Sequence, residues 1–215
     1  MNKAIEHYDF NYFENYQKKM GIFGGKANIF LFEKFINKDD IVLDFGCGGG
    51  FLLSNLTCKR KIGIEINEIP RNFCNSQGID CYANIDEIED SSIDVIISSH
   101  CLEHTTSPHE YLSKFYKKLK KDGKVIIIVP TDTFWVKFKK NDIDYHLYSF
   151  SPMNLGNLLD SCGFLNISAS PIFHKWPPYY TYLVKFFGWK IFHLVSTLWG
   201  LLNLSKVQIR AIAKK

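Results

Sequence analysis

Three histidines of this sequence carry the side chain that most often moves a proton or binds a metal near neutral pH. His100 and His104 belong to a His-x-x-Glu-His motif, which one group of metalloproteases uses to bind zinc, with the glutamate as the base. Here the motif directly follows a predicted strand and starts a loop, and no third ligand is evident on a second helix. The six cysteines form no Cys-x-x-Cys pair, which favours free, mostly buried thiols. We therefore predict no metal site.

The third histidine, His146, lies in a loop that follows the fifth predicted strand. Open α/β sheets bind their ligands at the carboxyl ends of the strands, so His146 is expected at the rim of the binding crevice. An imidazole suits a general base at neutral pH. We therefore name His146 as the candidate catalytic residue, with His100 as the second. The alternative is that His146 only orders its loop.

A glycine-rich turn joins a buried strand to the start of a helix, with glycines at positions 46, 48 and 50. Glycine lets the backbone approach a bound ligand closely. A dinucleotide-binding loop requires another glycine where this chain has Phe51. Asp44, two residues before the first glycine, would repel a pyrophosphate and attract a cation. Both residues favour S-adenosylmethionine, whose amino and sulfonium groups are positive, over a nicotinamide dinucleotide.

The second predicted strand ends at Glu65, 21 residues after Asp44. A carboxylate at the tip of the neighbouring strand can accept hydrogen bonds from both ribose hydroxyls of a nucleoside. Both candidate ligands contain a ribose, so Glu65 supports nucleoside binding without choosing between them. The alternative is a solvated carboxylate at a strand end.

Strands and helices alternate along the middle of the chain, which predicts an α/β, Rossmann-like fold with a mostly parallel sheet and helices on both faces. Short apolar runs predict strands at 41–45, 61–66, 79–83, 93–98, 124–129, 164–170 and 206–213. Helical patterns fall at 51–57, 68–77, 108–120, 152–161 and 180–204. Two further helices, at 8–19 and 26–35, are expected to be separated by a break at the glycines of 21–25.

Several segments resemble successive motifs of the class I S-adenosylmethionine-dependent methyltransferases, in the branch that acts on small molecules. They are Asp-Phe-Gly-Cys-Gly-Gly-Gly at 44–50, Gly-Ile-Glu at 63–65, the stretch 93–104 ending in Leu-Glu-His, and 119–125 with Pro130. The resemblance covers about residues 35–170, and the closing strand also fits. It implies a seven-stranded sheet with one antiparallel strand, at 206–213.

The resemblance also implies which residues bind the cofactor. They are Asp44, Gly46, Cys47, Gly48, Glu65, Ile66, Asn84, Ile85, Ser99 and His100. Asn84 and Ile85 would flank the adenine, while Ser99 and His100 would lie near the methionine part. The family often has an acidic residue where this chain has Asn84, so either Asn84 or Asp86 is a candidate for contacting the adenine amino group. Leu-Glu-His is common in the family at this point, a second reason against zinc.

The length of 215 residues predicts one domain. We divide it into an N-terminal helical lid at 1–36, a core at 37–170, an apolar helical insertion at 171–205 and a last strand at 206–215. The chain is 46% hydrophobic and 22% charged and carries no N-terminal secretory signal, so we expect a cytoplasmic protein. Its oligomeric state is not predicted.

Charge is distributed unevenly along the chain, because no acidic residue follows Asp160 while seven basic residues do. This asymmetry favours an anionic surface or substrate near the C-terminal part; the alternative is a set of solvated lysines. Lys185, Lys190 and His193 interrupt the apolar segment 176–204, so it is too short to span a membrane. We favour a cap packed near the acceptor site over the alternative of peripheral contact with the inner membrane surface.

These observations predict a methyltransferase that moves a methyl group from S-adenosylmethionine to a small-molecule, glycan or lipid-linked acceptor at oxygen. The alternatives are a nicotinamide-dependent oxidoreductase and a non-catalytic nucleotide-binding protein. Nucleic acid is not an expected partner, because no Asn-Pro-Pro-Tyr or Asp-Pro-Pro-Tyr sequence follows the fourth strand.

Overall fold

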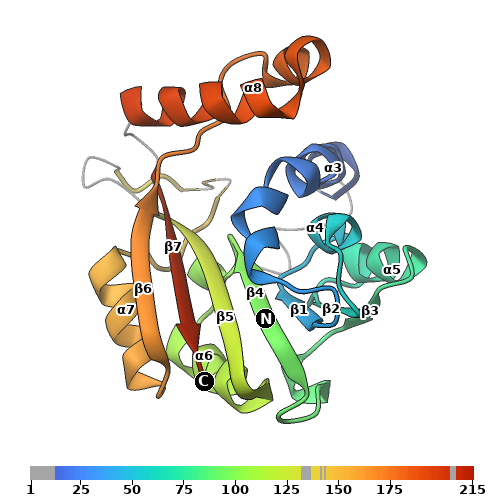
Figure 1. Cartoon of the computed structure of the whole chain (residues 1–215), viewed down its shortest axis with the longest axis vertical. Coiled ribbons are helices and arrows are strands. Elements are labelled where there is room, and N and C mark those ends of the chain that lie inside the picture. Colours follow the sequence, from blue (N-terminus) through green and yellow to red (C-terminus); the bar gives the residue numbers. More distant parts are fainter. Residues whose placement is uncertain (1–12, 132–136, 141, 143, 204–206) are drawn as a thin grey trace.

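The computed structural model describes residues 13–131, 137–140, 142, 144–203 and 207–215. Seven strands form one sheet in the order β3-β2-β1-β4-β5-β7-β6 (Figure 1). Their bounds are β1 Ile41–Phe45, β2 Arg60–Ile64, β3 Asp80–Tyr82, β4 Ile93–Ser99, β5 Leu119–Thr131, β6 Leu165–Ile172 and β7 Val207–Lys214. Strands β1 to β5 pair in parallel, and β7 runs antiparallel to both β5 and β6. The predicted fold, with its single antiparallel strand, is confirmed.

Helices cover both faces of this sheet (Figure 1). Helices α6 (Pro108–Lys118) and α7 (Pro152–Ser161) contribute Leu112, Phe115 and Leu155 to the core on one face. Helices α4 (Phe51–Asn55) and α5 (Glu68–Ser76) lie on the other face. The two faces share β5, where Ile126 and Ile128 point to one side and the residues between and after them to the other. Its continuous apolar run is what a strand buried on both faces requires.

The N-terminal segment corrects one prediction. The glycines at 21–25 do not break a helix: α3 runs through them from Lys18 to Ala27. A Cβ atom at Gly21 would lie 2.2 Å from the Phe51 ring, and one at Gly25 would lie 2.2 Å from the Phe51 carbonyl oxygen. These glycines therefore let α3 press against α4, and that contact outweighs their low helix propensity.

The described part of the helix predicted at 8–19 is helical, whereas short turns replace the helix predicted at 26–35. A π-helical turn, η1 (Phe13–Gln17), precedes α3, and two 3₁₀ turns, η2 (Ile29–Leu31) and η3 (Glu33–Phe35), stand where a helix was expected at 26–35. Residues 1–12, which include most of the predicted first helix, lie outside the described residues.

Helix α8 (Tyr180–Leu202) lies beyond the carboxyl ends of the parallel strands, at the top of Figure 1. It is kinked at Gly188, whose φ of 74° and ψ of 175° are not helical. Its inner side packs on α3, where the Phe23 ring lies 4.6 Å from Tyr180 and 5.4 Å from Trp189, measured between ring centroids. Within the described part of the chain, no helix is long and apolar enough to cross a membrane.

Candidate functional site

The glycine-rich turn lies directly after β1 and is bent by left-handed backbone at Gly46, Gly48 and Gly50, with φ between 53° and 79°. The amides of Gly46 and Cys47 both donate to the Ile64 carbonyl, at 2.9 and 3.1 Å. A Cβ atom at Gly46 would lie 2.3 Å from the Cys101 sulfur, so no other residue fits there without movement. Steric room and backbone conformation thus both demand glycine at this position.

Glu65, at the end of β2, holds this turn in place. Its Oε2 accepts a hydrogen bond from the Gly48 amide at 3.0 Å, and its Oε1 accepts one from the Asn67 amide at 2.9 Å. Burial raises the pKa of the Glu65 carboxyl, while these two hydrogen bonds act in the opposite direction. A carboxylate has further lone pairs, so Glu65 can hold the turn and still accept hydrogen bonds from a ligand.

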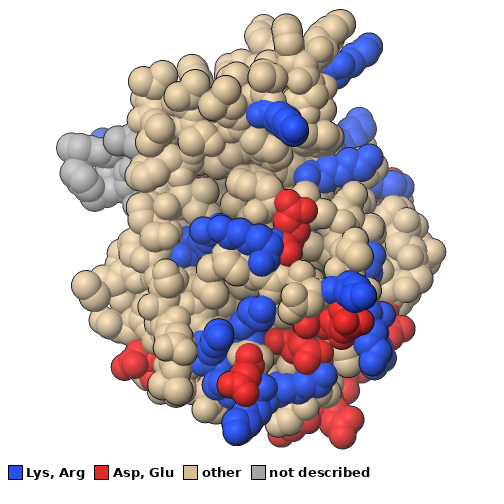
Figure 2. Space-filling model, viewed as in Figure 1, with Lys and Arg blue, Asp and Glu red and all other residues tan. Residues whose placement is uncertain are grey.

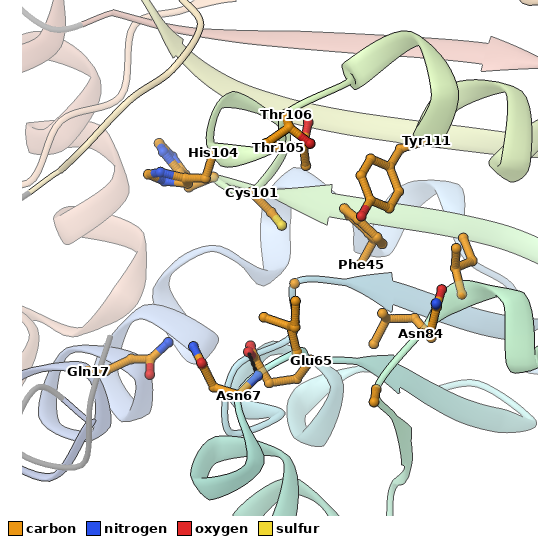
Figure 3. A pocket seen from close by; sticks show the side chains of 16 residues that line it. Gln17, Phe45, Glu65, Asn67, Asn84, Cys101, His104, Thr105, Thr106 and Tyr111 are labelled. Atoms are coloured by element: carbon orange, nitrogen blue, oxygen red, sulfur yellow. Dashed lines mark hydrogen bonds between the residues drawn. The ribbon is translucent and has the colours of Figure 1, made fainter. Parts of the chain in front are cut away.

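A first cavity of about 310 Å³ opens beside the turn, at the carboxyl ends of β1 to β4. Figure 3 shows Glu65 and Asn67 entering from one wall, Cys101 and His104 from the opposite wall, and Tyr111 near Phe45. Of the predicted cofactor residues, Gly46, Glu65, Ile66, Asn84, Ile85 and His100 line this cavity. Asp44, Cys47, Gly48 and Ser99 lie outside its lining.

The structure separates the two candidates for the adenine contact. Asn84 lines the first cavity, and its side-chain oxygen accepts a hydrogen bond from the Asp86 amide at 3.0 Å. The Asp86 carboxylate lies outside the cavity and forms an ion pair with Lys114 at 2.9 Å. Asn84 is therefore the better placed of the two, through its amide group.

Asp44 lies behind the turn and is only 3% exposed. Burial, followed by repulsion from Cys81 and Glu65, raises the pKa of this carboxyl to about 8. A cation bound at the turn would favour the ionised form of Asp44. The attraction of Asp44 for a positive ligand stays a prediction; it would act through the turn and would accompany the loss of a proton from Asp44.

Cys47 points away from the first cavity into a cluster of three buried thiols. Its sulfur lies 3.5 Å from that of Cys81 and 3.9 Å from that of Cys74. Hydrogen bonds with Cys47 and then with Cys74 lower the pKa of the Cys81 thiol. The cysteines are free, and this cluster supports the turn from below.

A second cavity of about 420 Å³ adjoins the first, and His100 lines both. Its walls come from separate parts of the chain: Asn28, Pro130, Thr131, Asp144, His146, His174, Lys175, Trp176, Val207 and Gln208. His146, the predicted catalytic residue, thus lies in the second cavity. His100, whose backbone is left-handed with a φ of 53°, contributes to the walls of both cavities.

The loop that carries His146 is fastened to the Glu103 backbone. The amides of Leu147 and Tyr148 both donate to the Glu103 carbonyl, at 2.9 and 3.1 Å. The His146 ring lies 5.1 Å from that of His104, measured between centroids. Desolvation, followed by the nearby His146, lowers the pKa of His104 to about 4, so His104 is neutral at physiological pH.

Glu103, His104 and His146 place ligand atoms within 4.8 Å of one another, as the three cysteines also do, and either group could hold a metal ion. Sequence reasoning found no third ligand because His146 lies 42 positions after His104. The absence of a metal stays a prediction.

Six residues of the first cavity were not predicted from the sequence: Gln17, Asn67, Cys101, Thr105, Thr106 and Tyr111. Asn67 follows Glu65 closely enough to have been considered, whereas Tyr111 had the spacing of a core residue.

Comparisons with known proteins agree with this geometry. The sequence model of a methyltransferase domain family matches residues 14–169. Phosphoethanolamine N-methyltransferase 3 of Arabidopsis thaliana is 28% identical over 147 residues, covering 60% of this chain and 29% of that protein. Ubiquinone biosynthesis O-methyltransferase of Rickettsia bellii is 30% identical over 99 residues, 40% of each chain. The match therefore spans less than half the length of either curated relative.

A solved structure with the same fold is a SAM dependent methyltransferase from Archaeoglobus fulgidus. It is 21% identical, with a TM-score of 0.62, and the superposition covers 96% of this chain and 99% of that one. The fold is thus the one that this methyltransferase has. The chain belongs to the methyltransferase domain family, which confirms the predicted family and favours the methyl donor over a nicotinamide dinucleotide.

Proposed function

We propose that this protein transfers a methyl group from S-adenosylmethionine to a hydroxyl oxygen of a small-molecule, glycan or lipid-linked acceptor. One observation carries the proposal: His100 joins a cavity beside the glycine turn to a second cavity that His146 lines. The first cavity has the features of a cofactor site and the second those of an acceptor site. A methyl group presented at His100 would face an acceptor beside His146.

The residues of the first cavity fit the cofactor in their chemistry. Gly46 lines the cavity with its backbone, and the Glu65 carboxylate keeps lone pairs for ribose hydroxyls. Ile66, Ile85 and Tyr111 offer apolar surface for an adenine beside the amide of Asn84. Burial raises the pKa of Asp44 to about 8, so this carboxyl would gain its negative charge at neutral pH when a cationic ligand binds at the turn.

The bound cofactor would supply an electrophilic methyl carbon on a sulfonium, and the protein's task is to align a nucleophile and exclude water. A hydroxyl nucleophile gains from a base that takes its proton, and we assign this role to the His146 imidazole. His104 is held neutral beside it and accepts or donates one hydrogen bond without adding charge. His100 positions groups at the junction of the two cavities.

Two titrations test the cofactor half of this proposal. Calorimetry should show micromolar or tighter binding of S-adenosylhomocysteine and no binding of NADH at the same concentrations. Binding of NADH alone would contradict the proposal. Formation of S-adenosylhomocysteine during turnover with an acceptor then separates an enzyme from a non-catalytic nucleotide-binding protein.

The curated relatives include an N-methyltransferase for phosphoethanolamine and an O-methyltransferase of ubiquinone biosynthesis, so the accepting atom needs its own test. We suggest catechol as a hydroxyl probe and phosphoethanolamine as an amine probe, each with isotopically labelled methyl donor. Mass spectrometry of the products should find label on the catechol oxygen. Label on the phosphoethanolamine nitrogen alone would contradict transfer to oxygen.

A further inference from the structure

The outer face of helix α8 exposes a stripe of large apolar side chains. Tyr182, Phe186, Phe187, Ile191, Leu194, Leu198, Leu201 and Leu202 are each between 41% and 84% exposed. Ile191, Leu194, Leu198, Leu201 and Leu202 follow the kink at Gly188 and recur at helical spacing on one side, while the inner side buries Phe192, Ser196 and Gly200. Tyr182, Phe186 and Phe187 lie on the turns before the kink. Large exposed apolar groups gathered on one element mark a surface that binds another molecule or a membrane.

The packing of α8 onto the body explains why this stripe faces outward. The Lys175 amide donates to the Ser196 carbonyl at 3.0 Å, and the rings of His174 and His193 are joined by a 3.1 Å hydrogen bond. A Cβ atom at Gly200 would lie 2.7 Å from the Phe173 carbonyl carbon. Small and polar residues thus dock α8 closely, and its largest apolar groups stay on the outside. Helix α8 thus packs on the body through its inner side, and its role as a cap stays a prediction.

The charged side chains on α8 are all positive. Lys185 and Lys190 are exposed on α8, and the Lys185 ammonium lies 5.8 Å from the centroid of the Phe186 ring. Every charged residue after Asp160 is basic. In the face drawn in Figure 2, acidic and basic side chains mix over the centre and lower half, while the surface over α8, at the top, shows separate lysines among uncharged residues.

We propose that this outer face of α8 docks the protein onto a membrane surface containing anionic lipids. Aromatic and leucine side chains flanked by lysines are the composition of helices that lie in the plane of the lipid headgroups. Such a helix lies on the bilayer, in keeping with an α8 that cannot cross it. A second copy of the chain is the less suitable occupant, because two such faces would bring lysines together with no carboxylate from 161–215 to pair them.

Docking of α8 would also bring the second cavity close to the lipids. His174, Lys175 and Trp176 line that cavity, and the same segment is hydrogen-bonded to α8. The acceptor then belongs to the lipid-linked class, a consequence that rests on the proposed function. The docking itself is independent of catalysis.

Co-sedimentation of the full chain with vesicles tests the docking. We expect binding to phosphatidylcholine vesicles containing phosphatidylglycerol and much weaker binding to phosphatidylcholine alone. Phe186→Ser with Leu194→Ser should lower vesicle binding at least tenfold. Lys185→Gln with Lys190→Gln should lower it by roughly 30-fold, since each lysine near an anionic surface contributes about fivefold. The matched control is Met153→Ser with Leu165→Ser, which also removes exposed apolar groups, but on α7 and β6, and should leave binding unchanged.

Two results would overturn the docking. One is failure of the wild-type protein to sediment with either vesicle. The other is a dimer in sedimentation velocity that Phe186→Ser with Leu194→Ser disperses, which would assign the face to a second copy. Calorimetry with S-adenosylhomocysteine, run on every variant, should give unchanged affinity, so a failed docking experiment stays separate from a failed cofactor assignment.

Discussion

The two cavities share His100, yet the chain builds them from different kinds of segment. Most of the first cavity comes from residues that directly follow β1, β2, β3 and β4, and backbone hydrogen bonds hold its central carboxylate. The second cavity draws side chains from residue 28 to residue 208. The first cavity is therefore a property of local turns in a parallel sheet, while the second cavity exists only when distant segments pack together.

Gly46→Ala should have the largest effect on cofactor affinity, because it disrupts the glycine turn that lines the first cavity. The new methyl group would meet the Cys101 sulfur at a φ of 79°. We expect S-adenosylhomocysteine affinity to fall at least about 100-fold, since both steric clash and backbone strain oppose the native turn. Calorimetry measures the loss.

Gly78→Ala is the matched control for that substitution. Gly78 has nearly the same φ, 76°, but nothing lies within 4 Å of its Cβ position. It should cost only about 1 kcal/mol of stability and leave cofactor affinity intact. Equal losses of affinity in the two variants would show that backbone strain alone, and not the contact with Cys101, explains the Gly46 result.

His146→Ala addresses the second cavity alone. If its imidazole removes the acceptor proton, kcat should fall about 10²- to 10⁴-fold while S-adenosylhomocysteine affinity changes little. Steady-state kinetics and calorimetry together make this separation. Unchanged turnover would remove His146 from the mechanism and leave it the structural role of ordering its loop.

Glu65→Gln should lower S-adenosylhomocysteine affinity about 10- to 100-fold, because hydrogen bonds to a charged group are the stronger kind. Asp86→Asn is the control: it changes a carboxylate next to Asn84 that pairs with Lys114 outside the first cavity. Its affinity should equal that of the wild type. A loss in Asp86→Asn as large as that in Glu65→Gln would return the adenine contact to Asp86.

Asp44→Asn should give a smaller effect on stability with a definite dependence on pH. The folded pKa of about 8 exceeds the usual value of a carboxyl, so the contribution of Asp44 is most favourable in acid and is lost as pH rises toward 8. Without cofactor, the variant should melt several degrees higher than the wild type at pH 8, at about 2–4 °C per kcal/mol, and closer to it at pH 5. A difference in melting temperature that grows toward acidic pH would contradict the predicted direction of the pH dependence.

The smallest expected effect concerns the metal content of the purified protein. Methyl transfer from a sulfonium needs no Lewis acid, so elemental analysis of the purified protein should find well under one equivalent of zinc. One equivalent that disappears in His146→Ala would assign the group of Glu103, His104 and His146 to a metal. One that disappears in Cys74→Ser would assign it to the three cysteines.

Some elements and site residues were predicted correctly from the sequence, and others were not. The strand at 41–45 and the helix at 152–161 were predicted with the bounds that the structure has, because apolar runs, proline and glycine act locally. The break at 21–25 was wrong, because glycine reads as a helix breaker until its contact with Phe51 is known. Ser99 was assigned to the cofactor, yet it lies outside both cavity linings.

The glycine turn, the carboxylates around it and the α/β class could be predicted from the amino-acid sequence, because each follows from residue types a few positions apart. The second cavity, the approach of His146 to His104 and the outward stripe of α8 became visible only in the folded chain, because the direction of side chains on different segments depends on how helices and loops pack. The inner contacts of Ser196 and Gly200, which turn the apolar side of α8 to the outside, involve partners more than twenty residues away.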